Sequence, residues 1–415
     1  MMGCRRVTSF AGVAVFVVAW SGGCLPQSSF AVGVEKLLPT KMTPQLETVI
    51  DLWMQQAIDR GDLPGAVIVA ADRERIRYAK ALGHRLLDPI PEPMTLDSVF
   101  DLASLTKPVA TATAVMVLVD RGELSVDDLV INHWPEFANV GDERGNKNAG
   151  KPSMRLKHLL LHTSGLTPDN ALSDYQQGSE RAWRKISGQR LRSRPGERFA
   201  YSDVGFLVLQ RVVEIRSGVP LDEFVQDEVF SPLGMTDTVY RPSHDLRSRI
   251  APTEKRRGSW IRGEVHDPRA FELGGVAGHA GLFSTAADLI AFGRMMLRQG
   301  RCSSSPNDTR RIFSVSTWKE MTKPRSVGRG TRTFGWDHRS PYSSNRGSTL
   351  SEQAFGHGGF TGTVLWIDPA RDFVFVFLSS RLHPDGRGKV NALAGKIATQ
   401  LVPNGNHSVS RSEDP

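Results

Sequence analysis

Ser104 and Lys107 lie three residues apart and form the first pair in the sequence that could do chemistry together. Apolar residues recur at helical spacing behind them, which predicts a helix over 104–121 with both side chains on one face. The lysine could accept the serine hydroxyl proton if partial burial keeps its pKa low. A helix N-terminus also offers unpaired N–H groups to a developing oxyanion. The spacing alone is common, however, and Ser104 could instead be an N-cap.

Two further groups of residues have chemical potential. Tyr201 and Asp203 precede a predicted helix, and a loop tyrosine beside a carboxylate can accept and donate a proton. The alternative is a packed tyrosine, with Asp203 capping the helix. His357, Gly358 and Gly359 precede a predicted strand, and such glycines let a substrate backbone lie close against a sheet edge. The start of an ordinary hairpin would explain the glycines but not the histidine among them.

The elements that must position these groups are strands at both chain ends and helices between them. Hairpins are expected at 65–70 with 76–82 and at 362–368 with 373–378, and terminal helices over 42–58 and 390–401. The intervening candidate helices are 104–121, 156–161, 205–217, 221–230 and 285–297, the last with a T-x-x-D capping box. The predicted fold class is therefore α/β (α+β). One antiparallel sheet is formed from both chain ends and flanked by terminal helices, with a mostly helical region inserted over about 90–325.

In this order, the serine-x-x-lysine, tyrosine-x-aspartate and histidine-glycine-glycine groups resemble the motifs of the serine β-lactamases and low-molecular-weight penicillin-binding proteins. The tyrosine form is similar to the branch of class C β-lactamases, D-Ala-D-Ala carboxypeptidases and family VIII esterases. The stretches LLLHTSGL at 159–166, PLGM at 232–235 and GVAGHAGLFST at 275–285 resemble that branch too. The segment VHD at 265–267, with the glycine-rich run after it, resembles a membrane-associated D-alanyl-D-alanine carboxypeptidase subgroup. The resemblance covers about residues 42–402.

The resemblance implies an active-site-serine acyl hydrolase that forms an acyl-enzyme on Ser104 without a metal or other cofactor. Lys107 would help to deprotonate Ser104. Tyr201 would relay the proton to the leaving group and activate the deacylating water. The oxyanion hole would be the backbone N–H groups of Ser104 and Phe360. The substrates implied are small molecules or peptidoglycan-derived compounds: D-alanyl peptides, esters or lactams.

Departures from the family pattern concern the expected substrate-binding residues Asp203, His357, Gly358 and Gly359. Asp203 stands where asparagine is usual, so an ionised side chain could only accept a hydrogen bond. His357 and Gly358 stand where β-lactamases carry lysine and threonine, and they would hold a substrate carboxylate less firmly. Efficient β-lactamase activity is therefore not expected, whereas ester or peptide hydrolysis is. An alternative is a surface penicillin-recognising or wall-binding protein that becomes acylated but turns over little.

Three residues suggest another class of enzyme. His266, Asp267 and His279 could be metal ligands of a hydrolase, with His357 as a further imidazole, and such an enzyme would be inhibited by chelators. Their spacing matches no helical ligand pair, and the surrounding glycines indicate a loop. Hydrogen bonds that brace this loop are the other interpretation. We predict no metal site.

The N-terminus predicts export. Two arginines precede an apolar run at 7–20, which is short for a membrane span and typical of a signal peptide. Small residues then precede Cys24, and this segment resembles a lipoprotein processing site. Ordinary signal-peptide cleavage is the alternative. We expect a signal at 1–24, a tether at 25–40, a hydrolase domain at 41–403 and a polar tail at 404–415. The expected location is the periplasm or cell envelope, with membrane attachment if Cys24 is lipidated.

The composition is that of an ordinary globular protein, with 40% hydrophobic residues in 415 and a net charge of +8. Arginine-rich stretches such as 181–198 are interpreted as solvated surface, and no nucleic-acid partner is predicted. Of the three cysteines, two lie in the targeting segment, which leaves one thiol in the mature domain. The fold is therefore not expected to depend on disulfides or on a cysteine-ligated zinc ion.

Overall fold

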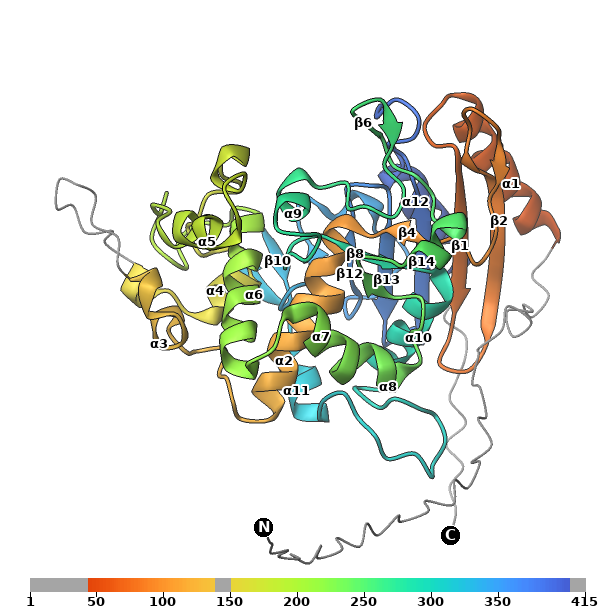
Figure 1. The fold of residues 1–415 in the computed structure, drawn as a ribbon. Helices are drawn as coiled ribbons and strands as arrows, with labels where there is room; N and C mark the ends of the chain where they lie inside the picture. Colours follow the sequence, from red (N-terminus) through yellow and green to blue (C-terminus); the bar gives the residue numbers. More distant parts are fainter. Residues whose placement is uncertain (1–43, 139–150, 404–415) are drawn as a thin grey trace, which may run out of the picture. The chain divides into compact units, whose positions relative to one another are not determined.

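A nine-stranded antiparallel sheet forms the centre of the fold (Figure 1), in a computed structural model that describes residues 44–138 and 151–403. The strand order is β3-β2-β1-β14-β13-β12-β11-β10-β9. The bounds are β1 Gly65–Ala71, β2 Ile76–Leu86, β3 Glu92–Pro93, β9 Arg325–Val327, β10 Gly330–Arg332, β11 Asp337–Arg339, β12 Phe355–Gly358, β13 Val364–Asp368 and β14 Phe373–Ser379. Because β1 pairs with β14, the two chain ends meet inside the sheet, which confirms the predicted fold class.

Alternation along the central strands creates two separate cores. In β14, Phe375 and Phe377 face one side, where α1 (Pro44–Asp59) and α12 (Asn391–Leu401) cover the sheet. Val374 and Val376 face the other side, against α10 (Ala286–Leu297) and the helical region. Successive side chains of a strand point to opposite faces, so a strand buried on both sides is apolar throughout.

The helical region lies between β3 and β9 in the sequence. Its helices include α2 Thr113–Asp120, α3 Val130–His133, α4 Leu156–Leu160, α5 Ser179–Ser187, α6 Asp203–Ser217, α7 Leu221–Val225, α8 Ser231–Leu233, α9 Pro268–Glu272 and α11 Val315–Thr322. It also holds a small sheet of β4 (Phe100–Asp101), β8 (Leu282–Ser284) and β5 (Val239–Tyr240), and the pair β6 (Lys255–Arg256) and β7 (Ser259–Trp260). The region is mostly helical, as expected, and the small sheet was not predicted.

The helix predicted over 104–121 is divided in the structure, so that prediction was wrong in detail. A 3-10 turn at Ala103–Leu105 leads into a wide π-helical stretch at Lys107–Ala112, and only then does α2 begin. Pro108 lies in the wide stretch and has no N–H to donate to the preceding turn. The window Ala103–Asp120 is long and apolar enough to cross a membrane, but 83% of it is buried in the protein, as in a core helix.

Other predicted helices agree with the structure to within a few residues. Thr285 caps α10, and its Oγ1 accepts a hydrogen bond from the N–H of Asp288 at 3.3 Å. The helix expected over 221–230 ends early, because α7 gives way to a π-helical turn at Gln226–Phe230. Cys24, the tether and the polar tail lie outside the described residues. Cys302 is a free, partly buried thiol.

Candidate active site

Ser104 lies on the 3-10 turn that follows β4, at the wall of a pocket of about 610 Å³. The preceding residue, Ala103, has a φ of 45°, a left-handed conformation that costs roughly 1–2 kcal/mol for a residue other than glycine. The carboxylate of Asp101 stabilises this turn by accepting a hydrogen bond from the N–H of Ala103 at 2.9 Å. The hydrogen bond from Ala103 to Asp101 thus stabilises the strained turn, and the turn places Ser104 at the pocket wall.

The serine turn is also clamped to the third motif. The hydroxyl of Thr361 donates to the carbonyl of Asp101 at 2.7 Å, and that of Thr363 donates to the carbonyl of Leu102 at 3.0 Å. These contacts join residues about 260 positions apart in the sequence. The position of Ser104 relative to the histidine-glycine-glycine strand is therefore fixed by two buried hydrogen bonds.

Lys107 is fully buried behind Ser104 and makes three polar contacts. Its Nζ lies 3.0 Å from Ser104 Oγ, 2.6 Å from Asp203 Oδ1 and 3.1 Å from the carbonyl oxygen of His279. Burial lowers the pKa of Lys107, but the adjacent Asp203 and Tyr201 outweigh it and raise that pKa above its ordinary value. The condition under which Lys107 could accept the serine proton, a pKa kept low by burial, is therefore not met, because Asp203 pairs with this amine.

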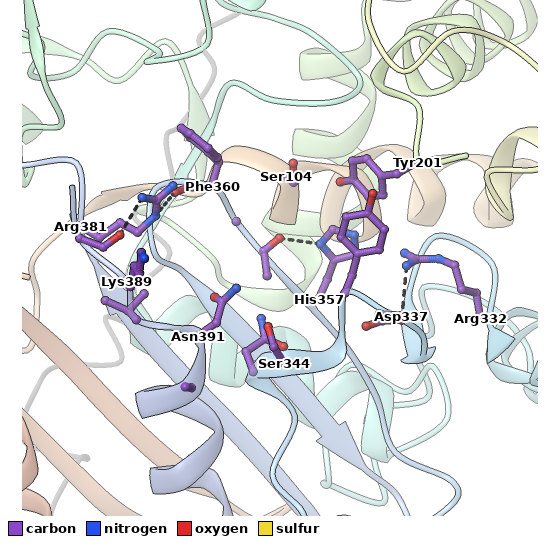
Figure 2. A pocket seen from close by; sticks show the side chains of 17 residues that line it. Ser104, Tyr201, Arg332, Asp337, Ser344, His357, Phe360, Arg381, Lys389 and Asn391 are labelled. Carbon is purple, nitrogen blue, oxygen red and sulfur yellow. Dashed lines mark hydrogen bonds and ion pairs between the residues drawn. The ribbon is translucent and has the colours of Figure 1, made fainter. Parts of the chain in front are cut away.

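Tyr201 stands beside this ion pair. The Lys107 ammonium lies 5.0 Å from the centre of the Tyr201 ring. Its ring stacks on His162 with centroids 4.3 Å apart, and Tyr342 covers it at 5.1 Å. Figure 2 shows the Tyr201 hydroxyl directed towards Ser104. A phenol held in this way can exchange a proton with the serine or with a group bound to it.

Asp203 is the first residue of α6 but not its cap. The cap is Ser202, whose Oγ accepts from the N–H of Gly205 at 3.1 Å. The Asp203 side chain turns to Lys107 and is not part of the pocket wall. It is therefore placed to hold the lysine.

The third motif supplies one wall of the pocket. His357 is buried in β12 and its Nδ1 lies 2.8 Å from the carbonyl oxygen of Gly358. Burial, together with the nearby Arg332 and Lys107, holds the pKa of His357 well below its usual range, so the imidazole is neutral. Strand β11 pairs with β12 only at Gly356, so beyond that residue the β12 edge is free to face the pocket.

Gly359 and Phe360 complete the motif. A Cβ on Gly359 would lie 2.1 Å from Thr363 Oγ1 and 2.3 Å from the carbonyl oxygen of Leu102, so only glycine fits there. No acceptor for the backbone N–H of Phe360 is found among the described residues, and its carbonyl accepts from Arg381 Nε at 2.6 Å. Arg381 therefore holds the peptide group that follows Phe360, and the Phe360 N–H, which belongs to the preceding peptide group, is a donor without an acceptor in the described part of the chain. This is what an oxyanion hole requires.

The pocket unites most of the residues expected from the sequence. Ser104, Tyr201, His357, Gly358, Gly359 and Phe360 line it, whereas Lys107 and Asp203 are not among its lining residues. Lining residues that the sequence analysis missed include Arg332, Asp337, Tyr342, Asn345, Arg381 and Lys389. They come from β10, β11, the loop before β12 and the segment before α12, and no spacing in the sequence connects them.

His266, Asp267 and His279 make hydrogen bonds in the loop. His279 Nε2 lies 3.0 Å from Asp267 Oδ1, and His266 Nδ1 lies 3.2 Å from Glu254 Oε1. Although burial alone would raise it, the nearby His279 holds the pKa of Asp267 well below its usual range. Within 44–138 and 151–403, no three such side chains are arranged to hold a metal ion. The loop contacts Lys107 through the carbonyl of His279, so it braces the lysine.

Comparisons with known proteins agree with this geometry. A family model described as "Beta-lactamase" matches residues 50–400. The protein named "Putative D-alanyl-D-alanine carboxypeptidase" of Escherichia coli O157:H7 is 33% identical over 367 residues, covering 80% of this chain and 82% of the relative. The protein of the same name from E. coli strain K12 is 32% identical over 366 residues, with the same coverage.

Solved structures share the fold. EstCE1, described as a hydrolase with promiscuous acyltransferase activity, superposes with a TM-score of 0.65 at 21% identity, covering 86% of this chain and 97% of that one. A penicillin-binding protein homologue from Caulobacter crescentus has a TM-score of 0.65 at 20% identity, covering 88% and 97%. At these identities the likeness concerns the fold.

Proposed function

This chain belongs to the beta-lactamase family and is a serine hydrolase, and from that premise we propose that Ser104 attacks acyl substrates to form a covalent acyl-enzyme. The substrates we propose are D-alanyl peptides, as the names of the bacterial relatives suggest, with esters and lactams as further acyl donors. One observation carries the proposal: the buried Lys107 ammonium contacts both Ser104 Oγ and Asp203, beside Tyr201.

The charge of Lys107 determines the proposed proton path. An ammonium ion cannot accept the serine proton, but it can donate a hydrogen bond to Oγ and stabilise the alkoxide that forms. The hydroxyl of Tyr201 is then the group that relays the proton: its oxygen accepts the proton of Ser104 as its own proton passes to the leaving group. This differs from the expected role of Lys107 as the group that deprotonates Ser104, and it makes Lys107 an electrostatic partner.

The remaining steps balance with these groups. Ser104 Oγ bonds to the acyl carbon while the backbone N–H groups of Ser104 and Phe360 stabilise the oxyanion. The bond to the leaving nitrogen breaks, and that nitrogen takes the proton from Tyr201. Water then attacks the acyl carbon and gives its proton to Tyr201. The ester bond to Ser104 breaks, and the proton returns to Oγ.

We also propose that the protein is exported. The arginine pair, the short apolar run and Cys24 support a signal followed by a processing site. Export would bring the enzyme to peptidoglycan, the natural source of D-alanyl peptides. Expression of the full chain in a bacterium, with fractionation and intact mass of the product, tests this. A Cys24→Ser variant that moves from the membrane to the soluble envelope fraction would indicate lipidation, whereas retention of both forms in the cytoplasm excludes export.

Turnover and adduct formation test the chemistry. The full-length protein and its Ser104→Ala variant are mixed with a fluorescent penicillin, p-nitrophenyl butyrate and an N-acylated D-alanyl-D-alanine peptide. Intact mass and product release are then followed. We expect Ser104-dependent release of D-alanine, and loss of roughly 10³-fold or more in the variant, since the nucleophile is removed.

The outcomes separate the alternatives. A lasting penicillin adduct with little turnover of peptide or ester would favour the penicillin-recognising protein. Ester turnover without peptide turnover would favour an esterase. Full activity in Ser104→Ala would contradict the proposed nucleophile.

A further inference from the structure

The pocket lacks a cation where the family places one. His357 stands at the position of the β-lactamase lysine and is neutral, and Gly358 replaces the threonine. If the leaving group is D-alanine, as the proposed function requires, its carboxylate needs another partner. The cationic side chains that line the pocket within the described residues are those of Arg332, Arg381 and Lys389.

Two of these three cations are poorly placed for that task. Arg381 donates from Nε to the carbonyl of Phe360 and from Nη1 to the carbonyl of Gly388, and its guanidinium lies 4.4 Å from the centre of the Phe360 ring. Its donors therefore hold the backbone at Phe360 and Gly388. Lys389 is exposed at the end of the pocket near α12. An exposed ammonium gains little from an ion pair because water screens it.

Arg332 is a buried cation with unused donors. Its side chain is fully buried, and a single ion pair joins it to the protein, from Nη1 to Asp337 Oδ1 at 3.3 Å. Nε and Nη2 have no hydrogen-bond acceptor among the described residues. Unpaired donors on a buried charge are costly, and an anion in the pocket would satisfy them.

The position of Arg332 relates it to the leaving group. Its guanidinium carbon lies 6.0 Å from the centre of the Tyr201 ring, and Figure 2 shows the side chain reaching towards Tyr201 and His357. In the proposed mechanism Tyr201 protonates the leaving nitrogen. In D-alanine the carboxylate is one carbon away from that nitrogen. A carboxylate on the leaving group would therefore lie close to Tyr201, and Arg332 is a cation of the pocket wall beside that residue.

Asn345 adds a second donor at the same wall. It is 2% exposed, and its Oδ1 accepts from Trp366 Nε1 at 3.1 Å, which leaves the Nδ2 hydrogens for another partner. That Nδ2 lies 2.3 Å from where a Cβ on Gly358 would be. The Asn345 amide thus occupies the space that a side chain at position 358 would fill, and it supplies donors there.

Asp337 connects the two residues. It pairs with Arg332, and its Oδ2 accepts from the hydroxyl of Ser343, in the 3-10 turn that ends at Asn345. We propose that Arg332 and Asn345 form a subsite for the carboxylate of the leaving group, in place of the lysine and threonine side chains that this chain lacks. This inference rests on the proposed function and identifies the substrate as one that ends in a free carboxylate.

Binding to an enzyme that cannot react tests the subsite directly. Full-length protein carrying Ser104→Ala is titrated by calorimetry with N-acetyl-D-alanyl-D-alanine and with its C-terminal amide. We expect the acid to bind roughly tenfold or more tightly than the amide, since a hydrogen bond to a charged group contributes this much. Equal affinities, or no binding of the acid at millimolar concentration, would overturn the proposal.

Substitutions show which residues cause the preference for the acid over the amide. Arg332→Gln should abolish the preference for the acid. Asn345→Asp should weaken binding of the acid alone, because aspartate keeps the acceptor for Trp366 but replaces the Nδ2 donor by a carboxylate oxygen. Arg339→Gln removes an exposed arginine of β11 outside the pocket and is the matched control. If Arg332→Gln leaves Asp337 uncompensated and unfolds the protein, Arg332→Gln/Asp337→Asn removes the pair together. An equal loss for acid and amide would contradict the subsite.

Turnover separates this inference from the proposed function. With Ser104 intact, Arg332→Gln should reduce kcat/KM for the peptide acid roughly tenfold or more beyond any change in kcat/KM for p-nitrophenyl butyrate, whose leaving group carries no carboxylate. Ester turnover that depends on Ser104, without a preference for the peptide acid over its amide, would contradict the subsite and support Ser104 as the nucleophile. A preference for acids in binding, without Ser104-dependent turnover, would support the subsite and contradict Ser104 as the nucleophile.

Discussion

At the residue scale, the ammonium group of Lys107 contacts three acceptor oxygens. Lys107 lies within hydrogen-bonding distance of Ser104, Asp203 and the carbonyl of His279, so its position and its charge are both fixed. A buried lysine without a carboxylate would lose its proton easily. Asp203 prevents this and thereby determines which form of the lysine meets the nucleophile.

Replacing Asp203 by asparagine should move the pH dependence of the reaction. The carboxylate raises the pKa of Lys107, so without it burial prevails and the ammonium is lost at lower pH. If the charged lysine is the active form, the alkaline limb of kcat/KM moves to lower pH. The pH profile of p-nitrophenyl butyrate turnover measures this, after subtraction of the Ser104→Ala rate.

Asp222→Asn is the control for that experiment. Asp222 also pairs with a cation, Arg241, but lies on α7 away from the pocket. Its substitution should leave the profile unchanged. An alkaline limb that stays in place in Asp203→Asn would show that Lys107 does not act through its charge.

At the element scale, the end of β12 and the serine turn form one unit. The hydroxyls of Thr361 and Thr363 bind the carbonyls of Asp101 and Leu102, and Gly359 lies against the carbonyl of Leu102. The distance between the two N–H groups of the proposed oxyanion hole therefore depends on these contacts. Small displacements of such donors reduce catalysis strongly.

Thr363→Val should impair catalysis more than folding. Valine keeps the shape of threonine but removes this donor from the buried carbonyl of Leu102, which keeps only its bond from the N–H of Leu105, at a cost of about 0.5–1.5 kcal/mol. We expect kcat for the ester to fall by roughly tenfold or more, with KM little changed, since the oxyanion forms only in the transition state. Thr113→Val, which removes a buried hydroxyl bond to the carbonyl of Pro108, is the matched control. Equal kinetic losses in both variants would argue against a specific clamp.

At the scale of the whole molecule, the sheet separates a catalytic side from a supporting side. Helices α2, α6 and α10 contribute to the larger core, whereas α1 and α12 close the smaller core behind the sheet. The smaller core depends on large side chains such as Trp366, Phe375 and Phe377, all fully buried. Its role is to hold the two chain ends together through the pairing of β1 with β14.

Phe377→Ala should therefore destabilise the protein without changing the chemistry. Removing a buried phenylalanine costs about 3–5 kcal/mol, because a cavity remains in a packed core. Urea unfolding followed by fluorescence measures this, and kcat well below the unfolding temperature should stay within about twofold. Leu52→Ala, at an exposed position of α1, should cost little. A small effect of Phe377→Ala would show that the supporting core is not packed as described.

Local sequence patterns determined the elements and the residue types of the site. Continuous apolar runs separated by turn residues predicted the two central hairpins, and a strand buried on both faces is apolar throughout. Motif order predicted that Ser104, Tyr201 and His357 meet, and the pocket brings them together. The family resemblance and the fold class were confirmed by the comparisons. The roles assigned to the site residues and to Cys24 stay predictions.

Only the tertiary structure decided the charges and the unexpected neighbours. The pKa of Lys107 depends on Asp203, which lies 96 residues away, and its direction could not follow from the spacing of Ser104 and Lys107. The pocket positions of Arg332 and Asn345 likewise arise from strand order and a 3-10 turn. Local patterns record which face of an element is buried, because burial is periodic. Electrostatics depends on distances between elements, and only the fold sets those distances.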